Sequence, residues 1–473
     1  MADPLELRDE LEPALGAAAR EATAYARGLG DDPVHDSTSD RLLDELDRPL
    51  PEHGRGAVEA LAELAARGRA TATRSSGPRF FHFVTGGTTP AALGADWLTS
   101  AFDQNGFAWE SSSLAARMEG IAVRWLRELF ELPGDFGGAL VTGATMANFT
   151  GLIAARGWWA ERTGFDADDA GLAGARPPAI LSGGYVHPSA VQALGMLGLG
   201  RTNVQRLARD GAGRVDLDAL AQALAREDRP AIVIANAGEV NAGDFDPIDA
   251  IAALVREHDA WLHVDGAFGL FARLAPESRH LVAGVEHADS ITVDAHKWLN
   301  VPYDCGISFV RDPRRLGRAL TVGAPYLPDA DDPRPNRGFL TPENSRRARA
   351  LAIWATLRAY GRDGYRAMVE RHLELARQLA DRVDREPELE RLAEVKLNIV
   401  CFRVRPSGLD EDGLDALNGA LGERLLSDGR VFCGTTVYDG KVAFRPAIVN
   451  WQTTEPDVQM LVDRLLELLH RES

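Results

Sequence analysis

The segment Ser290-Ile291-Thr292-Val293-Asp294-Ala295-His296-Lys297-Trp298 joins an apolar, β-branched run to a short polar stretch that contains one lysine. The run 291–293 predicts a buried strand. Open α/β sheets place their chemistry outside the carboxyl ends of the strands, where Lys297 would lie. Desolvation there would favour the neutral, nucleophilic amine, so Lys297 is a candidate for forming a Schiff base. The segment alone is equally consistent with a second interpretation, in which Lys297 has no catalytic role and only extends its amine into solvent.

Short apolar runs alternate with helical patterns through the middle of the chain. We expect strands near residues 139–142, 179–181, 231–235, 261–264, 291–293 and 306–310. Helical patterns lie between several of these runs, as in 146–160 and 248–258. This alternation predicts an α/β fold with a mostly parallel, doubly wound sheet.

The sequence predicts three parts: a helical N-terminal arm (1–77), a large domain (78–360) and a small α+β C-terminal domain (361–473). The arm repeats leucines at helical spacing. In the C-terminal part, strands at 396–404, 431–437 and 441–448 surround a helix at 412–426, which predicts an antiparallel sheet. Residues 321–345 are rich in proline and aspartate, which is typical of a functional loop or lid.

Composition narrows the class of protein. The chain has 473 residues and a net charge of −18, which disfavours nucleic acid and anionic membranes as partners. Its three cysteines form no metal-binding pattern and fit a reducing compartment. The acidic N-terminus does not look like a signal peptide, and no apolar run is long enough to span a bilayer. We therefore expect a cytoplasmic protein without a metal site.

The stretch Thr142-Gly143-Ala144-Thr145 lies between a predicted strand and a predicted helix. Small residues, exposed N–H groups, a hydroxyl and the helix dipole together make a seat for an anion. Helix capping alone would also explain these residues.

Three further features suit the binding of a flat, cationic ring. Asp265 follows the run 261–264, and a buried carboxylate there needs a cationic partner, such as a protonated pyridine nitrogen, unless it only caps a helix. Ala267 is small enough for a ring to lie against it, and His187 could stack on a ring or lie at the surface. The separation of Asp265 and Lys297 fits a strand, a crossover helix and a nearby strand. Asn241 lies in a glycine-rich turn on the same side.

Together these features match pyridoxal phosphate. Its aldehyde would bind Lys297, its ring nitrogen would pair with Asp265, and its phosphate would rest on Ala144 and Thr145. Asp265 would keep the nitrogen protonated, so that the ring can accept the electrons of a carbanion.

The chain resembles the group II pyridoxal-phosphate-dependent amino acid decarboxylases, the family of aromatic-amino-acid, glutamate and histidine decarboxylases. The resemblance is carried by Pro78-Arg79-Phe80-Phe81, Trp97-Leu98-Thr99-Ser100, Met118-Glu119, His263-Val264-Asp265, His296-Lys297-Trp298 and Arg346-Arg347. It implies a fold type I enzyme with a seven-stranded sheet in the large domain, and a homodimer with interfacial active sites.

The resemblance also implies roles for individual residues. Lys297, His187 and Asp265 would be catalytic, as the Schiff-base lysine, the stacking residue and the pyridinium partner. The cofactor-binding set would comprise these three with Ala144, Thr145, Ala267, His296 and Asn241. The substrate-binding set would comprise Phe81, His82, Trp109, Phe339 and Arg445, the last of these on the substrate carboxylate. The implied reaction is decarboxylation of an L-amino acid through a Schiff base on Lys297 and a quinonoid intermediate.

Two departures from the family pattern change these expectations. The mobile loop lacks the tyrosine that protonates the carbon after carbon dioxide leaves, and Arg337, Phe339 and Leu340 are the residues near its position. Loss of that hydroxyl to phenylalanine is linked in the family to oxidative decarboxylation–deamination, so an aldehyde synthase, or another carbon–carbon lyase or aldolase, is an alternative. Asp294 replaces the usual asparagine near the phosphate.

Two questions of function stay open at this point. Aromatic residues such as Phe81, Phe107 and Trp109 favour a substrate with an aromatic or apolar side chain. The alternative to an enzyme is a non-catalytic relative that only binds the cofactor. The presence of Lys297 together with Asp265 argues against this alternative.

Overall fold

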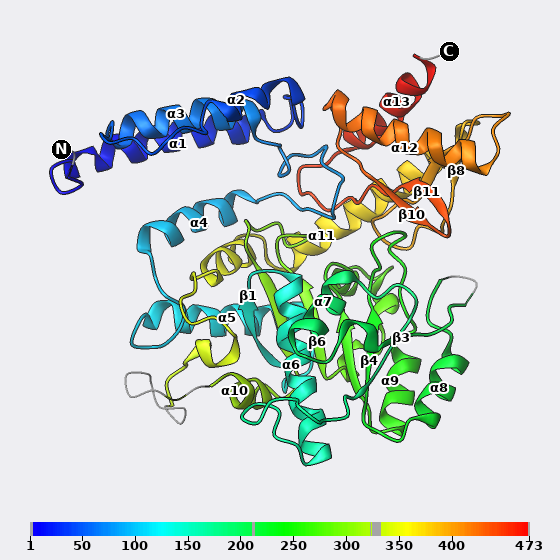
Figure 1. The fold of residues 1–473 in the computed structure, drawn as a ribbon. Coiled ribbons are helices and arrows are strands. Elements are labelled where there is room, and N and C mark those ends of the chain that lie inside the picture. The colour runs from blue at the N-terminus through cyan, green and yellow to red at the C-terminus, as the bar shows by residue number, and fades with distance from the viewer. Residues whose placement is uncertain (1–2, 211–212, 322, 324–332, 472–473) are drawn as a thin grey trace. The chain divides into compact units, whose positions relative to one another are not determined.

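The chain folds into two compact units in a computed structural model, which describes residues 3–210, 213–321, 323 and 333–471 (Figure 1). The sheet unit comprises Gly86–Arg377 and Glu394–Ile399. The terminal unit comprises Met1–Thr85, Gln378–Ala393 and Val400–Ser473. The three-part division at residues 77 and 360 stays a prediction.

In the described part of the chain, the sheet unit is built on a seven-stranded sheet with the order β1-β7-β6-β5-β4-β2-β3. Neighbouring strands from β6 through β3 run parallel, and β7 runs antiparallel to both β1 and β6. This confirms the predicted α/β class and the mostly parallel sheet. The strands are β1 Gly137–Val141, β2 Ala179–Ser182, β3 Val204–Arg206, β4 Ala231–Asn236, β5 Trp261–Asp265, β6 Ser290–Asp294 and β7 Gly306–Val310.

Helices α6 and α9 pack directly against the sheet: α6 contacts β1, β5, β6 and β7, and α9 contacts β4 and β5. The helices of this unit are α4 Pro90–Phe102, α5 Ser113–Leu129, α6 Ala144–Thr163, α7 Pro188–Met196, α8 Leu217–Arg226, α9 Ile248–Glu257, α10 Arg314–Leu320 and most of α11 Ala350–Arg385. Gly361, at φ 61°, interrupts α11 where two separate helices were predicted. Short 3₁₀ turns are η3 Arg201–Asn203, η4 Gly269–Leu274, η5 Arg279–Val282, η6 Val285–His287 and η7 Arg337–Leu340.

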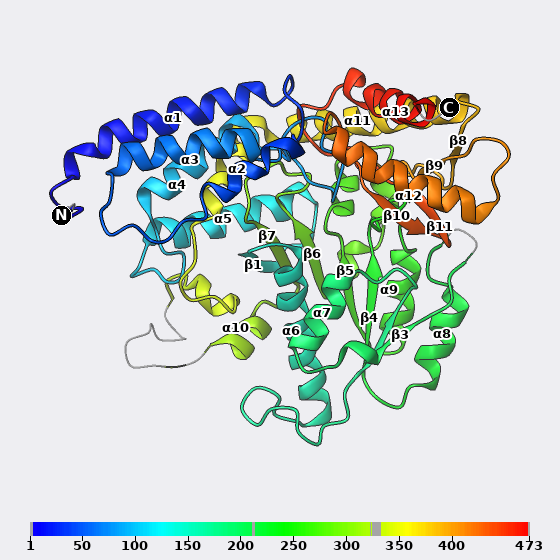
Figure 2. The same cartoon turned by 45° about the horizontal axis from the view of Figure 1, so that its top comes forward.

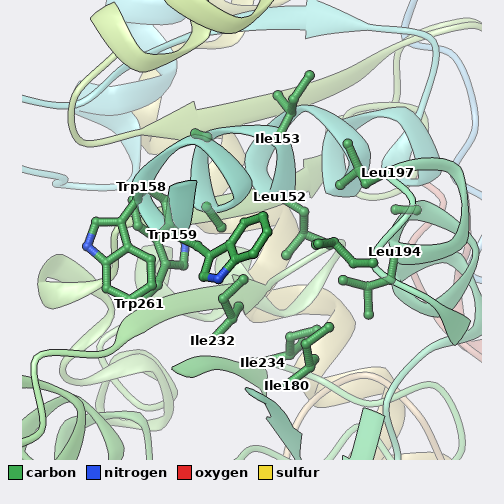
Figure 3. Close-up of a cluster of buried hydrophobic side chains, with 14 of the residues drawn as sticks. Leu152, Ile153, Trp158, Trp159, Ile180, Leu194, Leu197, Ile232, Ile234 and Trp261 are labelled. Carbon is green, nitrogen blue, oxygen red and sulfur yellow. The ribbon is translucent and has the colours of Figure 1, made fainter. Parts of the chain in front are cut away.

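An apolar core fills the space between α6 and the sheet. Figure 3 shows Trp158 and Trp159 of α6 against Trp261 and Ile232 of the strands. Trp159 is 1% exposed and Ile232 is fully buried, so this core fixes the helix whose first turn faces the candidate site.

One detail of the predicted topology is wrong. The connection between β5 and β6 contains the short turns η4, η5 and η6 in place of a crossover helix. Gly269 explains part of this difference, because a Cβ on that residue would lie 2.0 Å from the Ala237 carbonyl oxygen. Such close backbone contact leaves no room for the side chains of a regular helix. The short edge strand β3 was not predicted.

The terminal unit combines a helical arm with a small sheet. Helices α1 and α3 lie side by side in both views (Figures 1 and 2). A four-stranded antiparallel sheet has the order β10-β11-β9-β8, as expected for an α+β fold, although the observed strands are shorter than predicted and β8 was not predicted. The elements are η1 Arg8–Glu10, α1 Leu11–Gly28, η2 Ser37–Ser39, α2 Arg41–Asp44, α3 Ala57–Thr71, β8 Leu389–Arg391, β9 Phe402–Val404, α12 Glu411–Asp428, β10 Thr435–Tyr438, β11 Lys441–Phe444 and α13 Glu455–His470.

Two features are absent from the residues that the structure describes. No helix there is long and apolar enough to cross a membrane. Within the same ranges, no group of three or more His, Cys, Asp or Glu side chains could hold a metal ion.

A buried ion pair fixes the β1 edge of the sheet. Arg346 Nη1 lies 2.8 Å from Glu119 Oε2, and both side chains are at most 6% exposed. Glu119 also accepts a hydrogen bond from the Leu140 N–H, and Arg346 donates to the carbonyls of Gly106 and Leu140. The predicted helix at 346–360 begins only at Ala350, because the Arg346 backbone pairs with Gly106 and with the Asn105 side chain.

We expect Arg346→Met to lower the free energy of unfolding by about 3–5 kcal/mol, because it leaves the Glu119 carboxylate buried and uncompensated. The matched control is Arg347→Met, since Arg347 is 37% exposed and pairs with Asp96. Its loss should cost at most about 1 kcal/mol. Urea denaturation of both variants measures the difference, and equal losses would contradict a structural role for the buried pair.

Candidate active site

Lys297 lies just beyond the carboxyl end of β6, next to the end of β5. The two strands are parallel neighbours, with Asp265 opposite Thr292. The Asp294 N–H donates to the Ala267 carbonyl at 2.8 Å, which ties the two strand ends together. Lys297 Nζ lies 4.0 Å from Asp294 Oδ2, and the side chain is 14% exposed. The predicted meeting of Asp265 and Lys297 at one sheet edge is therefore present, without the crossover helix.

The backbone around Lys297 is held from several sides. Trp298 is fully buried, stacks on Phe271, and donates from Nε1 to His372 Nδ1 at 2.8 Å. The Gly86 N–H donates to the His296 carbonyl, and a Cβ on Gly86 would lie 1.8 Å from the Lys297 carbonyl oxygen. Only glycine allows the chain to pass this close, so the segment that carries the lysine is rigidly placed.

Asp265 is a buried carboxylate whose neighbours are neutral. Its Oδ2 accepts a hydrogen bond from Asn148 Nδ2 at 3.1 Å, and its Oδ1 accepts one from the Ala267 N–H at 3.2 Å. The residue is 7% exposed. Among the described residues, no lysine, arginine or histidine forms an ion pair with it, so a bound cation would compensate its charge.

The N-terminus of α6 meets the end of β6. Gly143, at φ 151° and ψ −179°, precedes the helix in a conformation that only glycine adopts readily, and no side chain caps the first turn. A Cβ on Gly143 would lie 3.8 Å from His296 Cε1 and 3.9 Å from Asp294 Oδ1. The N–H groups that begin at Ala144 and Thr145 therefore lie on the same side as His296, as predicted for a phosphate site.

His296 and Asp294 form a close pair at this point. His296 Nδ1 lies 2.8 Å from Asp294 Oδ1, although neither atom makes a hydrogen bond of good geometry. The His296 ring packs on Tyr303, with 4.3 Å between the ring centroids. The His296 ring thus lies beside the helix N-terminus, where it can donate to an anionic group, whereas the Asp294 carboxylate only accepts and orients that ring.

His187 is linked to Asp265 through two residues that the sequence did not single out. Asn148 Nδ2 donates to Asp265 and also to Ser189 Oγ, at 3.0 Å. Ser189 Oγ lies 2.6 Å from His187 Nδ1, which also accepts from the Ser189 N–H at 3.2 Å. A polar residue on the apolar face of α6 is the signal that could have identified Asn148.

Asn241 lies in the turn that follows β4. Its N–H donates to Glu239 Oε2 at 2.8 Å, and burial raises the pKa of the Glu239 carboxyl. Lys396 pairs with Asp244 of the same turn at 2.8 Å. These contacts fix the turn, and the cofactor role of Asn241 stays a prediction.

Two of the predicted substrate residues form a second group in the sheet unit. The Trp109 N–H donates to Asn336 Oδ1, and Phe339 packs edge to face on Phe107 with 5.8 Å between the ring centroids. No contact in the described residues joins Phe339 to Lys297. The loop predicted at 321–345 lies partly outside the described residues, because 322 and 324–332 are not among them.

The other predicted substrate residues lie together in the terminal unit. Phe81 is 1% exposed, and its backbone pairs with Phe432 and Ala447. His82 Nδ1 accepts from the Gly434 N–H at 3.0 Å. Burial, together with the positive charge of Arg445, lowers the pKa of His82 to about 4. The substrate roles of Phe81, His82 and Arg445 stay predictions.

The residues present fit pyridoxal phosphate on three independent observations. Asp265 is buried without a cation in the described chain, which suits a pyridinium nitrogen. The α6 N-terminus lacks a side-chain cap and lies beside the His296 ring, so its N–H groups and that ring suit a phosphate. Lys297 presents a primary amine at the same sheet edge, 4.0 Å from Asp294 Oδ2.

Comparisons with known proteins agree with this fit. Residues 47–405, more than half of the chain, match the family model described as the pyridoxal-dependent decarboxylase conserved domain. The chain is 30% identical over 439 residues to an aromatic-L-amino-acid decarboxylase of Bacillus atrophaeus, covering 91% of this chain and 89% of that protein. It is 34% identical over 436 residues to an L-2,4-diaminobutyrate decarboxylase of Rhizobium meliloti (strain 1021), covering 90% and 84%.

The fold gives the same result. The solved structure of Oryza sativa TDC with PLP and tryptamine has a TM-score of 0.90 to this chain at 26% sequence identity, and the match covers 99% of each chain. The site geometry, the sequence and the fold agree. The chain belongs to the pyridoxal-dependent decarboxylase family and is an amino acid carboxy-lyase of fold type I, whose cofactor is pyridoxal phosphate.

Proposed function

We propose that this enzyme decarboxylates an L-amino acid with an aromatic or apolar side chain and releases the corresponding amine. The observation that carries the proposal is the convergence of Asp265, Lys297 and the α6 N-terminus at one edge of the sheet. Each of the three would engage a different part of pyridoxal phosphate, and together they leave one orientation for it.

The chain's own residues have distinct tasks in this proposal. The cofactor supplies an electron sink for the pair left when the carboxylate carbon departs. Lys297 would supply the amine that holds the cofactor. Asp265 holds a proton on the ring nitrogen, and Asn148 keeps the Asp265 carboxylate oriented. Thr145, His296 and the first turn of α6 retain the phosphate.

The choice of an aromatic or apolar substrate rests on the resemblance and on the Bacillus atrophaeus relative. The diaminobutyrate decarboxylase is slightly more identical, so relatives alone do not decide the substrate. In the sheet unit, the rings of Phe107 and Phe339 pack edge to face, and this aromatic pair suits an apolar substrate wall.

We expect the holoenzyme to release carbon dioxide and an amine from L-phenylalanine, L-tyrosine or L-tryptophan, with kcat/KM at least about tenfold above that for L-2,4-diaminobutyrate, because an aromatic wall does not compensate a second ammonium group. Product-resolved mass spectrometry over a panel of amino acids measures this. A preference for diaminobutyrate or glutamate would overturn the substrate class. Absence of any product would favour the non-catalytic alternative.

An aldehyde synthase is the second candidate, favoured by Phe339 near the place of the loop tyrosine. That reaction would consume oxygen and water and release carbon dioxide, ammonia and hydrogen peroxide with the aldehyde. The matched variant is Phe339→Tyr, which restores a hydroxyl. If the wild type makes aldehyde, this variant should shift the products toward amine, whereas amine without aldehyde or peroxide from the wild type rejects the synthase.

We also propose that the protein is a cytoplasmic homodimer. Leu11, Leu15 and Leu64 of the helical arm are 59–68% exposed, which suits burial against a second copy. Cys305, Cys401 and Cys433 are buried and form no disulfide among the described residues, as in a reducing compartment. Light scattering on the holoenzyme tests the dimer, and a monomer at micromolar concentration would contradict it.

A further inference from the structure

A buried chain of hydrogen bonds runs from the core of the sheet unit toward His187. Trp261, part of the tryptophan cluster in Figure 3, donates from Nε1 to Ser290 Oγ at 3.0 Å. Ser290 Oγ lies 2.8 Å from His263 Nδ1, and His263 Nε2 lies 2.8 Å from Asn148 Oδ1. Asn148 then continues the chain to Asp265 and Ser189, and it also accepts from Thr292, so one amide joins four polar side chains.

The direction of each hydrogen bond around Asn148 follows from chemistry. Both oxygens of Asp265 accept from N–H groups, so the Asn148 NH₂ group faces the carboxylate. Asn148 Oδ1 must then accept, from Thr292 Oγ1 at 2.9 Å and from His263 Nε2. Burial lowers the pKa of His263 to about 4, so this ring is neutral and carries its proton on Nε2.

The directions of the hydrogen bonds to His187 follow in the same way. Ser189 Oγ accepts from the Asn148 NH₂ group, so its own proton is free to point at His187 Nδ1. The Ser189 N–H also donates to that nitrogen. Two donors on His187 Nδ1 exclude a proton there, because the nitrogen must offer its lone pair to them.

We propose that Ser189 and Asn148 are positioning residues that fix the His187 ring as the neutral tautomer with its proton on Nε2. The orientation originates at the Asp265 carboxylate and passes through the Asn148 amide and the Ser189 hydroxyl. The ring that stacks on the cofactor thus presents an N–H donor from Nε2. The inference deepens the proposed function and rests on the stacking role of His187.

The test is ¹⁵N solid-state NMR of the holoenzyme labelled with ¹⁵N-histidine. The chain has 11 histidines, so His187→Gln identifies the His187 signals by difference. We expect a pyridine-like Nδ1 and a directly protonated Nε2 in the wild type. A proton on Nδ1 of His187, or on both of its nitrogens, would overturn the proposal.

Ser189→Ala tests whether the Ser189 hydroxyl fixes the tautomer of His187. It should give a mixture of tautomers and lower kcat by about tenfold with little change in KM, and Ser189→Thr should restore the wild-type spectrum. Ser308→Ala is the matched control, because Ser308 is a buried serine whose hydroxyl has no hydrogen-bond partner in the described chain. An unchanged tautomer in Ser189→Ala would remove Ser189 from the role. Lack of turnover with every amino acid would reject the proposed function while leaving the ¹⁵N result readable.

Discussion

Lys297→Ala is expected to abolish the visible absorption band of the bound cofactor and to lower kcat by on the order of a thousandfold or more. The reason is structural, because Lys297 Nζ is the primary amine that lies beside Asp294 at the end of β6. Alanine removes that amine and leaves intact the contacts of Trp298 and Gly86 that hold the backbone. Absorption spectra with added pyridoxal phosphate, together with single-turnover kinetics, measure both effects.

The chain offers matched controls for this experiment, because it contains only three lysines, Lys297, Lys396 and Lys441. Lys396 pairs with Asp244, and Lys441 begins β11. Neither Lys396→Ala nor Lys441→Ala should remove the absorption band. Loss of the band in one of these variants, with retention in Lys297→Ala, would move the covalent site elsewhere.

Asp265→Asn is expected to lower kcat by on the order of a hundredfold or more with a smaller effect on cofactor content. Asparagine is nearly isosteric and can still accept from Asn148, so packing at the strand end is kept. It cannot carry the negative charge that holds a proton on the ring nitrogen, and the electron sink is then weaker. Steady-state kinetics at saturating cofactor, with the fraction of bound cofactor measured separately, distinguishes the two effects.

Asp294→Asn is the comparison for this second prediction. Asp294 is also a buried carboxylate at a strand end, but it faces His296 on the phosphate side. The substitution restores the asparagine expected from the family, so we expect a clearly smaller loss of kcat than in Asp265→Asn. Equal losses would indicate that general charge at this edge, and not the contact of Asp265 with the ring nitrogen, determines the rate.

Much of the fold could be predicted because each buried strand is a short, continuous apolar run in the sequence. Buried parallel strands read as continuous runs, and β4, β5 and β6 all appear near their predicted places. Asp265 and Lys297 could be placed together for the same reason, because the carboxyl ends of neighbouring parallel strands share one edge. The crossover between them could not be predicted, because Gly269 and its close contact with Ala237 act only in three dimensions.

The residues that complete the site were harder to predict. Asn148 and Ser189 lie far from Asp265 in sequence, and their roles depend on hydrogen bonds that no local pattern encodes. Phe339 was predicted on the substrate side from the resemblance, whereas the structure shows its contact with Phe107. Local sequence patterns therefore predicted the strand ends well and the side-chain network poorly.

Borohydride reduction of the holoenzyme, followed by peptide mass spectrometry, tests the central claim most directly. Reduction fixes the cofactor as a stable secondary amine on the lysine that holds it. We expect a pyridoxyl phosphate group on the peptide that contains Lys297 and on no other of the three lysines. A modified Lys396 or Lys441, or a chain that carries no modification after reduction, would contradict it.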